Sequence, residues 1–83
     1  MTRILFFGSL RDRAGCAQME IDLPAHVDTL QALRVWLTDR NPDLGEALEA
    51  RSIRVAVDHA FVSHDAPIRA GAEIAFMSPL SGG

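Results

Sequence analysis

The residues best suited to chemistry in this chain are its last two, Gly82 and Gly83. Neither carries a Cβ, so an extended Gly-Gly segment fits a channel too narrow for other residues. The reactive group that it presents is the main-chain carboxylate of Gly83, which is a poor electrophile until an enzyme attaches a leaving group to it. The pattern predicts a carrier whose C-terminus is activated and passed between enzymes.

Other potentially reactive side chains lack the neighbours that catalysis or metal binding requires. Cys16 would need a nearby cation to form a reactive thiolate, and a small residue filling a turn is the simpler interpretation. The three histidines have no zinc-ligand spacing with it, and the HExxH, CxxC, GxGxxG and P-loop motifs are absent. Asp58, Asp65 and Glu73 are typical of a solvated surface. We therefore expect the chain to bind neither a metal nor ATP by itself.

Length and composition describe one small domain of 83 residues, of which 48% are hydrophobic, enough for a core. One cysteine cannot form an internal disulfide, and the sequence has neither a leader peptide nor an apolar run long enough to span a membrane. We expect a cytoplasmic protein. A net charge of −3 disfavours nucleic acid as a partner. All eight basic residues are arginine, so the chain has no lysine amine for its own activated tail to acylate.

Periodicity and breaker residues predict the order strand, strand, helix, strand, strand. The main helix begins at Asp28, which forms a capping box with Gln31, and it stops at Asn41-Pro42; Asp43 caps a second, short helix. Ser9 caps a helical turn that Gly15 ends. The expected strands are 2–8, 17–23, 53–57, 61–62 and 73–77, and the helical segments are 9–14, 28–41 and 43–51.

This order predicts an α+β fold of the β-grasp type, in which one main helix packs on one face of a mixed sheet. The first and last strands are expected to be parallel neighbours in the centre of the sheet. We divide the chain into a β-grasp domain, 1–77, and a flexible C-terminal Gly-Gly tail, 78–83.

Both faces of the predicted sheet are apolar, although the helix can cover only one. The helix side is expected to hold Ile4, Phe6, Val55, Val57, Ile74 and Phe76, and the outer face Leu5, Phe7, Ala56, Ala75 and Met77, with Phe61 nearby. Such a patch marks a protein-binding surface, or it is ordinary exposed apolar surface. The six residues from 78 to 83 extend at most about 20 Å, so a partner on this face could take the tail into its own interior. Arg11 is either a contact for that partner or a solvated side chain.

Several segments together resemble the small subunits of molybdopterin synthase, which are ubiquitin-like sulfur carriers. They are Ile4-Leu5-Phe6-Phe7, Arg11 with Gly15, Val57-Asp58-His59-Ala60-Phe61-Val62, and residues 71–83, so the resemblance covers the full length. It implies a ubiquitin-like β-grasp fold and assembly into a heterotetramer, with two small subunits at opposite ends of a large-subunit dimer.

The resemblance also implies the chemistry. An E1-like adenylyltransferase uses ATP and Mg²⁺ to adenylate the carboxylate of Gly83, and sulfur from a desulfurase or rhodanese-type donor displaces AMP to leave a thiocarboxylate. The tail then enters the large subunit, where the active site lies and where the sulfur is transferred to cyclic pyranopterin monophosphate during molybdenum cofactor biosynthesis. This chain would therefore be the sulfur-donor subunit and not itself the catalyst.

By the same resemblance, Gly83 is the reacting residue and Leu80, Ser81 and Gly82 form the rest of the tail. The residues expected to bind the partner are Phe7, Arg11, Phe61 and Met77. The chain departs from the family pattern at Met77 and Ser78, where a second aromatic residue and a first proline are common, and at Ala72, where an acidic residue is common.

Three alternatives stay open at this point. The thiamine-pathway sulfur carriers share the fold, the tail and the activation, but they lack the long helical middle that residues 28–51 provide here. A ubiquitin-like modifier would form isopeptide bonds to lysines of target proteins. An independent enzyme would use Cys16 or a histidine.

Overall fold

The computed structural model describes residues 1–78 of this chain, and residues 79–83 lie outside the described part. Eight elements follow one another within residues 1–78. They are β1 (Thr2–Phe7), α1 (Leu10–Ala14), β2 (Gln18–Ile21), α2 (Leu30–Arg40), α3 (Pro42–Leu48), β3 (Arg54–Val57), β4 (Ala60–Phe61) and β5 (Glu73–Met77).

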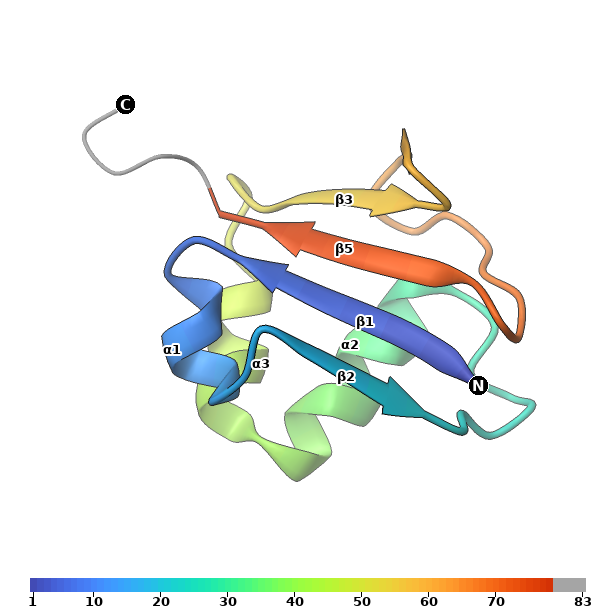
Figure 1. The fold of residues 1–83 in the computed structure, drawn as a ribbon, viewed down its shortest axis with the longest axis horizontal. Coiled ribbons are helices and arrows are strands. Elements are labelled where there is room, and N and C mark those ends of the chain that lie inside the picture. Colours follow the sequence, from blue (N-terminus) through green and yellow to red (C-terminus); the bar gives the residue numbers. More distant parts are fainter. Residues whose placement is uncertain (79–83) are drawn as a thin grey trace.

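The five strands form one mixed sheet in the order β2-β1-β5-β3-β4. β1 and β5 are parallel neighbours, and the β1–β2, β3–β5 and β3–β4 pairs are antiparallel. Figure 1 looks onto the sheet with the helices behind it, and β1 and β5 run side by side through its centre. This is the β-grasp arrangement that the element order predicted.

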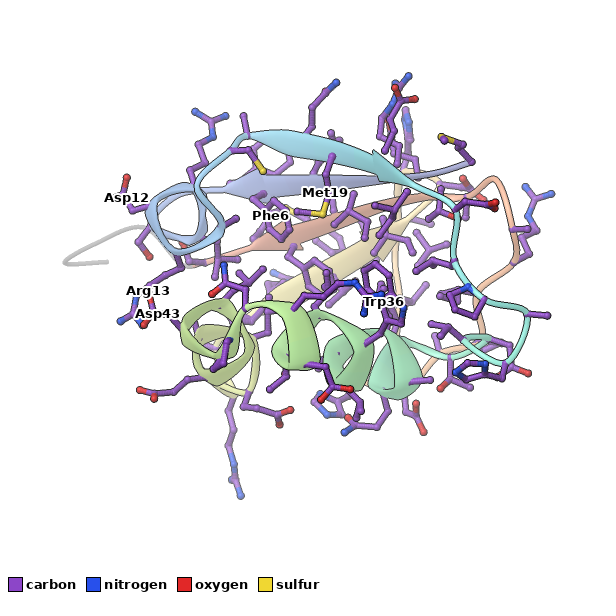
Figure 2. All side chains as sticks on the ribbon, turned by 90° about the horizontal axis from the view of Figure 1, so that it is seen from below. Phe6, Asp12, Arg13, Met19, Trp36 and Asp43 are labelled. Atoms are coloured by element: carbon purple, nitrogen blue, oxygen red, sulfur yellow. The ribbon has the colours of Figure 1, made fainter. Side chains whose placement is uncertain are left out.

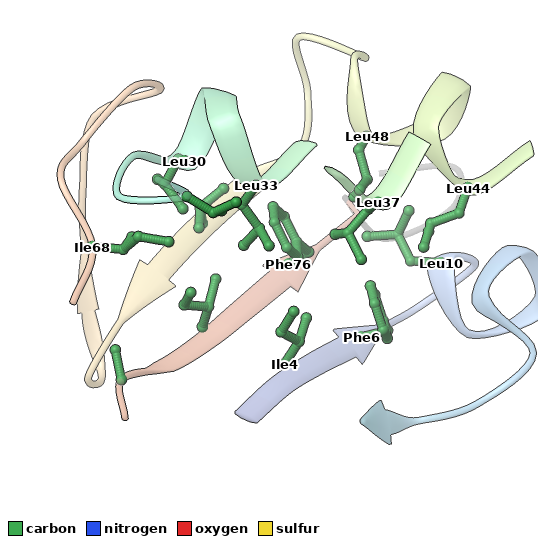
Figure 3. Close-up of a cluster of buried hydrophobic side chains, with 14 of the residues drawn as sticks. Ile4, Phe6, Leu10, Leu30, Leu33, Leu37, Leu44, Leu48, Ile68 and Phe76 are labelled. Carbon is green, nitrogen blue, oxygen red and sulfur yellow. The ribbon is translucent and has the colours of Figure 1, made fainter. Parts of the chain in front are cut away.

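The core lies between the sheet and the helices. Phe6 and Phe76, on adjacent strands, are fully buried with ring centroids 6.1 Å apart, and Leu33 and Leu37 of α2 are buried with them (Figure 3). Burying a side chain of this size stabilises the fold by about 1.5–3 kcal/mol. The prediction for the helix side of the sheet is confirmed. Five of the six side chains assigned to that side are buried, namely Ile4, Phe6, Val55, Ile74 and Phe76, and Val57 is half-buried.

The helix starts differ from the predicted caps by one or two residues. Thr29, not Asp28, caps α2, because its side chain accepts a hydrogen bond from the Ala32 N–H at 3.1 Å. The Gln31 N–H is bonded by a distant residue, the Asp65 carboxylate, also at 3.1 Å. A capping box of Asp28 with Gln31 was therefore wrong, because the long-range Asp65 contact is not visible in a local pattern.

Helix α3 starts at a proline. Asn41, not Asp43, caps α3, because its side-chain oxygen accepts the Leu44 N–H at 3.1 Å, and Pro42 takes the first helical position. Proline suits that position because its missing N–H would have no partner within the helix. The sequence signal that ends α2 therefore also begins α3, and α3 ends at Leu48 rather than near residue 51.

The short helix α1 packs against α3 at one end of the sheet. Arg13 forms an ion pair with Asp43 at 2.8 Å, and the Asn41 side-chain amide donates to the Arg13 carbonyl at 2.9 Å (Figure 2). Gly15 ends α1 at φ 78°, as predicted, but Ser9 makes no side-chain capping bond to the helix. The Ser9 hydroxyl instead faces residue 78.

The β3–β4 hairpin turns on Asp58 and His59, both with positive φ (50° and 74°). A two-residue turn of this kind matches the twist of the strands and favours asparagine, aspartate or glycine at its first position and glycine at its second, where this chain has His59. Asp58 is held there by its side chain, which accepts the Glu73 N–H at 3.0 Å and an Arg69 N–H at 3.1 Å. The fourth strand is therefore Ala60–Phe61, one residue earlier than predicted, and the second and third strands are shorter than predicted.

Arg34 of α2 is a buried charge that the pattern did not single out. Its Nη1 donates to the His64 carbonyl at 2.7 Å, which ties α2 to the segment after β4. Its Nε has no hydrogen-bond acceptor among residues 1–78. Burial lowers the pKa of this guanidinium, and the charges of Glu49 and Asp65 act in the opposite direction. Arg34 thus serves packing, at a desolvation cost.

Candidate functional site

Phe7 and Met77 end the two central strands and are direct partners in the parallel ladder. Both lie on the face of the sheet opposite the core, because Phe6 and Phe76 point inward and side chains alternate along a strand. Phe7 is 39% exposed and Met77 is half-buried. The structure therefore brings together two of the predicted partner-binding residues, at the end of the sheet where β5 finishes.

Arg11 lies beside Phe7. Its guanidinium carbon is 5.7 Å from the centroid of the Phe7 ring, within range of a cation–π contact. Its Nε donates to the Phe6 carbonyl at 3.1 Å, so the side chain is held across the end of β1. Arg11 is thus an anchored cation next to an exposed aromatic ring, rather than a freely solvated arginine.

Phe61 is connected to the same surface through Arg54, a residue that the sequence pattern did not single out. Phe61 is 60% exposed on β4, and the Arg54 guanidinium stacks on its ring at 4.2 Å from the centroid. Arg54 is in turn the ladder partner of Met77. The outward position of Arg54 was predictable from its alternation with Val55, but the stacking depends on the β3–β4 register. We call Phe7, Arg11, Arg54, Phe61 and Met77 the docking surface.

A second row of side chains extends the docking surface across the sheet. Leu5 is paired with Ala75, Ala75 with Ala56, and Ala56 with Phe61. The assignment of these residues to the outer face is consistent with the register, but Ala56 is only 8% exposed and contributes little contact area. Small residues in the centre make this part of the face shallow.

Charged side chains divide the outer face of the sheet into two parts. Arg3 bridges Glu20 and Glu73 across three strands, each at 3.7 Å, and His59 also contacts Glu73. These pairs lie at the end of the sheet where β1 and β5 begin. Within residues 1–78, no ion pair includes Arg11 or Arg54. The docking surface therefore combines apolar side chains with two cations that form no ion pair within residues 1–78, which suits a partner surface with apolar and acidic side chains.

An open groove of about 880 Å³ lies at the same end of the molecule. Its walls come from the ends of β1 and β5, from α1, from α3 and from the segment after α3, and they include Leu10, Arg13, Ala47, Ile53 and Ser78. A partner that covers the docking surface would also reach the mouth of this groove, since Phe7 and Met77 line both.

The predicted tail residues Leu80, Ser81, Gly82 and Gly83 lie outside the described residues. The division of the chain into a domain, 1–77, and a tail, 78–83, stays a prediction. The described chain ends at Ser78, one residue after the ladder pair of Phe7 and Met77. The docking surface therefore lies next to Ser78, and Figure 1 shows that β1 and β5 finish at the same end of the sheet.

The other candidate residues are not assembled into a site. Cys16 is half-buried and its Sγ faces the Ala14 carbonyl at 3.9 Å, consistent with a filler at a turn. Among residues 1–78, no three His, Cys, Asp or Glu side chains are grouped so that they could hold a metal ion. Over the same residues, every helix is too short or too polar to cross a membrane.

Comparison with known proteins places this arrangement in a family. The family model described as "ThiS family" matches residues 4–83. The molybdopterin synthase sulfur carrier subunit of Escherichia coli (strain K12) is 34% identical over 83 residues, and the match covers 100% of both chains.

Solved structures share the fold. SAMP1 from Haloferax volcanii superposes with a TM-score of 0.81 at 22% identity, over 99% of this chain and 98% of that one. The complex of subunits 1 and 2 of the molybdopterin-converting factor from Helicobacter pylori 26695 includes a chain with a TM-score of 0.63 at 19% identity, over 99% and 97% of the two chains. The matches in sequence and the shared β-grasp fold agree: the chain belongs to the ThiS family, and the curated relative from Escherichia coli is a molybdopterin synthase sulfur carrier subunit.

Proposed function

We propose that this chain is the sulfur carrier of a molybdopterin synthase and that it donates sulfur from a thiocarboxylate at Gly83. The observation that carries the proposal is the match to a curated sulfur carrier subunit over the whole length of both chains. The fold supports it, because the central strand β5 ends beside an exposed apolar surface and the Gly-Gly tail follows directly.

The chemistry follows from the properties of a carboxylate. An oxygen of the Gly83 carboxylate attacks the α-phosphorus of ATP on an E1-like adenylyltransferase, and pyrophosphate leaves with Mg²⁺. The resulting acyl-adenylate has AMP as a good leaving group, which the terminal sulfur of a persulfide donor displaces. A thiol then cleaves the acyl disulfide and releases the thiocarboxylate.

The large subunit of the synthase is the proposed acceptor of the loaded tail. The docking surface would bind it, with Phe7, Phe61 and Met77 as apolar contacts and Arg11 and Arg54 facing acidic residues. Docking and delivery are then one event, because the five residues 79–83 extend about 16–18 Å at most from the edge of that surface. The sulfur passes to cyclic pyranopterin monophosphate in the active site of the large subunit.

Intact mass spectrometry tests this function. The purified chain, incubated with its E1-like partner, ATP, Mg²⁺ and a persulfide donor, should gain about 16 Da as one oxygen is replaced by sulfur. A chain lacking Gly82 and Gly83, and a chain with one alanine appended after Gly83, should keep the wild-type fold but lose pterin sulfuration. Full activity of either variant would contradict the carrier mechanism.

Cell lysates, examined beside the mass measurement, separate the carrier from a ubiquitin-like modifier. A modifier would appear in lysates as high-molecular-weight conjugates linked to lysines of other proteins. The likeness to SAMP1 supports only the fold, since the identity is 22%. Conjugates without the gain of about 16 Da would favour the modifier.

A further inference from the structure

The Ser78 hydroxyl makes three contacts with the turn between β1 and α1. It accepts hydrogen bonds from the Ser9 N–H at 3.1 Å and from the Ser9 hydroxyl at 3.4 Å, and it donates to the Phe7 carbonyl at 3.3 Å. A hydroxyl has one donor and two acceptor sites, so these contacts use all of them. One side chain therefore ties the residue after β5 to the turn after β1.

This connection begins where the sheet stops. The parallel ladder between β1 and β5 ends at the pair Phe7–Met77, and after it the chain of β1 turns into α1. The side chain of Ser78 takes over from main-chain pairing for one more residue. Without it, the last fixed point of the chain before the tail would be Met77.

Gly8 leaves the space that this hydroxyl occupies. Gly8 has φ +67°, and a Cβ at this position would lie 2.2 Å from Ser78 Oγ but 3.6 Å from Ser78 Cβ. Only the hydroxyl, and not the rest of the Ser78 side chain, would be displaced by a methyl group there. Gly8, Ser9 and Ser78 thus form one unit, which we call the serine clamp.

We propose that Ser78 is a positioning residue for sulfur transfer: the serine clamp fixes the main chain at the end of β5, and with it the direction from which Gly83 is presented to its partners. The inference rests on the proposed function. A tail root held in place before binding loses less conformational freedom on binding. Loss of the clamp therefore weakens productive binding, while the chemistry at Gly83, which is set by the enzyme once the tail is seated, keeps its rate.

Kinetics of the E1-like partner test the positioning role. In steady-state adenylation, followed by pyrophosphate release, Ser78→Ala should raise the KM for the carrier about threefold to tenfold and change kcat less than about twofold. Ser78→Thr keeps the hydroxyl and should restore most of the loss. Ser63→Ala, the same change at an exposed serine after β4, is the matched control and should behave as wild type.

Gly8→Ala provides a second variant that leaves Ser78 in place. Its methyl group displaces the Ser78 hydroxyl, so it should raise KM as Ser78→Ala does. Alanine at position 8 is strained by the φ of +67° in either background, so the two backgrounds are compared: the increase in KM caused by Gly8→Ala should be smaller in Ser78→Ala than in wild type, because the nearest remaining atom is then an ordinary contact at 3.6 Å. Additive effects of the two changes would overturn the clamp as one unit. Melting temperatures establish that each variant is folded.

Hydrogen exchange tests the clamp without any partner. The Ser9 amide should exchange about fivefold faster in Ser78→Ala than in wild type, whereas the amides of β1 should not change. If wild-type carrier is never adenylated, the proposed function fails and the exchange result stands alone. If wild type is adenylated and Ser78→Ala has the wild-type KM, the positioning role is overturned.

Discussion

At the scale of the residue, Phe7 is the side chain that most directly tests the docking surface. It is 39% exposed, it contacts Met77 in the ladder and Arg11 beside it, and its loss should not disturb the core. Phe7→Asp should weaken binding to the large subunit by at least about thirtyfold, because a central aromatic contact is commonly worth about 2 kcal/mol or more. Isothermal titration calorimetry measures the change.

Val35→Asp is the control for this variant. Val35 is 53% exposed, but it lies on α2, in the helical layer on the other side of the sheet. The same substitution there should change the affinity by less than about twofold. Equal affinities for wild type and Phe7→Asp would show that the partner binds another face.

The charge of Asp58, in the hairpin turn, makes the stability of the fold depend on pH. The Glu73 N–H, and then the Arg69 guanidinium, hold the pKa of its carboxyl below the usual range. A carboxyl whose pKa is lower in the folded state stabilises the fold above its unfolded pKa of about 3.9, and this stability is lost as the pH falls through the folded pKa. An asparagine side chain tolerates positive φ and keeps an acceptor oxygen, so Asp58→Asn removes mainly the charge.

The difference in the free energy of unfolding between wild type and Asp58→Asn, measured with urea, therefore has a defined sign. Wild type should be the more stable at about pH 6, and the difference should shrink as the pH falls from about 3.9 through the lower folded pKa of Asp58, because the carboxyl then loses its charge. A difference that is constant over this range would mean that the charge of Asp58 contributes nothing to stability.

At the scale of the element, the α2–α3 contact depends on Gly45. A Cβ at this position would lie 2.2 Å from Thr38 Oγ1 and 2.6 Å from Thr38 Cβ, so the two helices would have to separate. In an open helix Gly→Ala stabilises by about 1 kcal/mol, whereas overpacking a contact of this kind costs about 1–3 kcal/mol. Gly45→Ala should therefore lower the free energy of unfolding, measured by urea denaturation.

Glu46→Ala, at an exposed position of the same helix, is the matched control and should change stability by less than about 0.5 kcal/mol. A gain in stability for Gly45→Ala would show that α2 and α3 separate at little cost. The close approach would then be unimportant for holding α3, and α1 with it, at the end of the sheet.

The elements also show which features of the fold a local sequence pattern can predict. The strands around Ile4 and Phe76 were predicted because short runs rich in apolar, β-branched and aromatic residues favour strands. The caps at Asp28 and Asp43 were wrong because Thr29 and Asn41 offer equivalent oxygens nearby, and the choice depends on where the chain enters the helix. The β3–β4 turn was missed for a similar reason, since Asp58 adopts positive φ through bonds to residues more than ten positions away.

The site was predictable where it depends on alternation and not where it depends on register. Phe7 and Met77 were expected on the outer face because their neighbours belong to the core. Arg54 was missed because its contact with Phe61 follows from the two-residue turn. The serine clamp was missed because it joins residues 9 and 78, which no sequence period relates.

At the scale of the whole molecule, one topological choice organises the functional end. The parallel pairing of β1 and β5 places Phe7, Met77 and the departure of the tail together. The short helices α1 and α3 pack at the same end and form the walls of the groove. Affinity for a partner and delivery of the C-terminus are thus built on the two most central strands of the sheet.

The same pairing has a practical consequence at the opposite end. Met1 is 77% exposed, and it precedes β1 by one residue, so the α-amino group lies about 20 Å from Phe7 along the strand (Figure 1). Because all eight basic residues are arginine, no side chain of these 83 residues carries a primary amine. An amine-reactive fluorophore attached at the amino end would therefore leave the docking surface unlabelled and report sulfur loading and subunit exchange in real time.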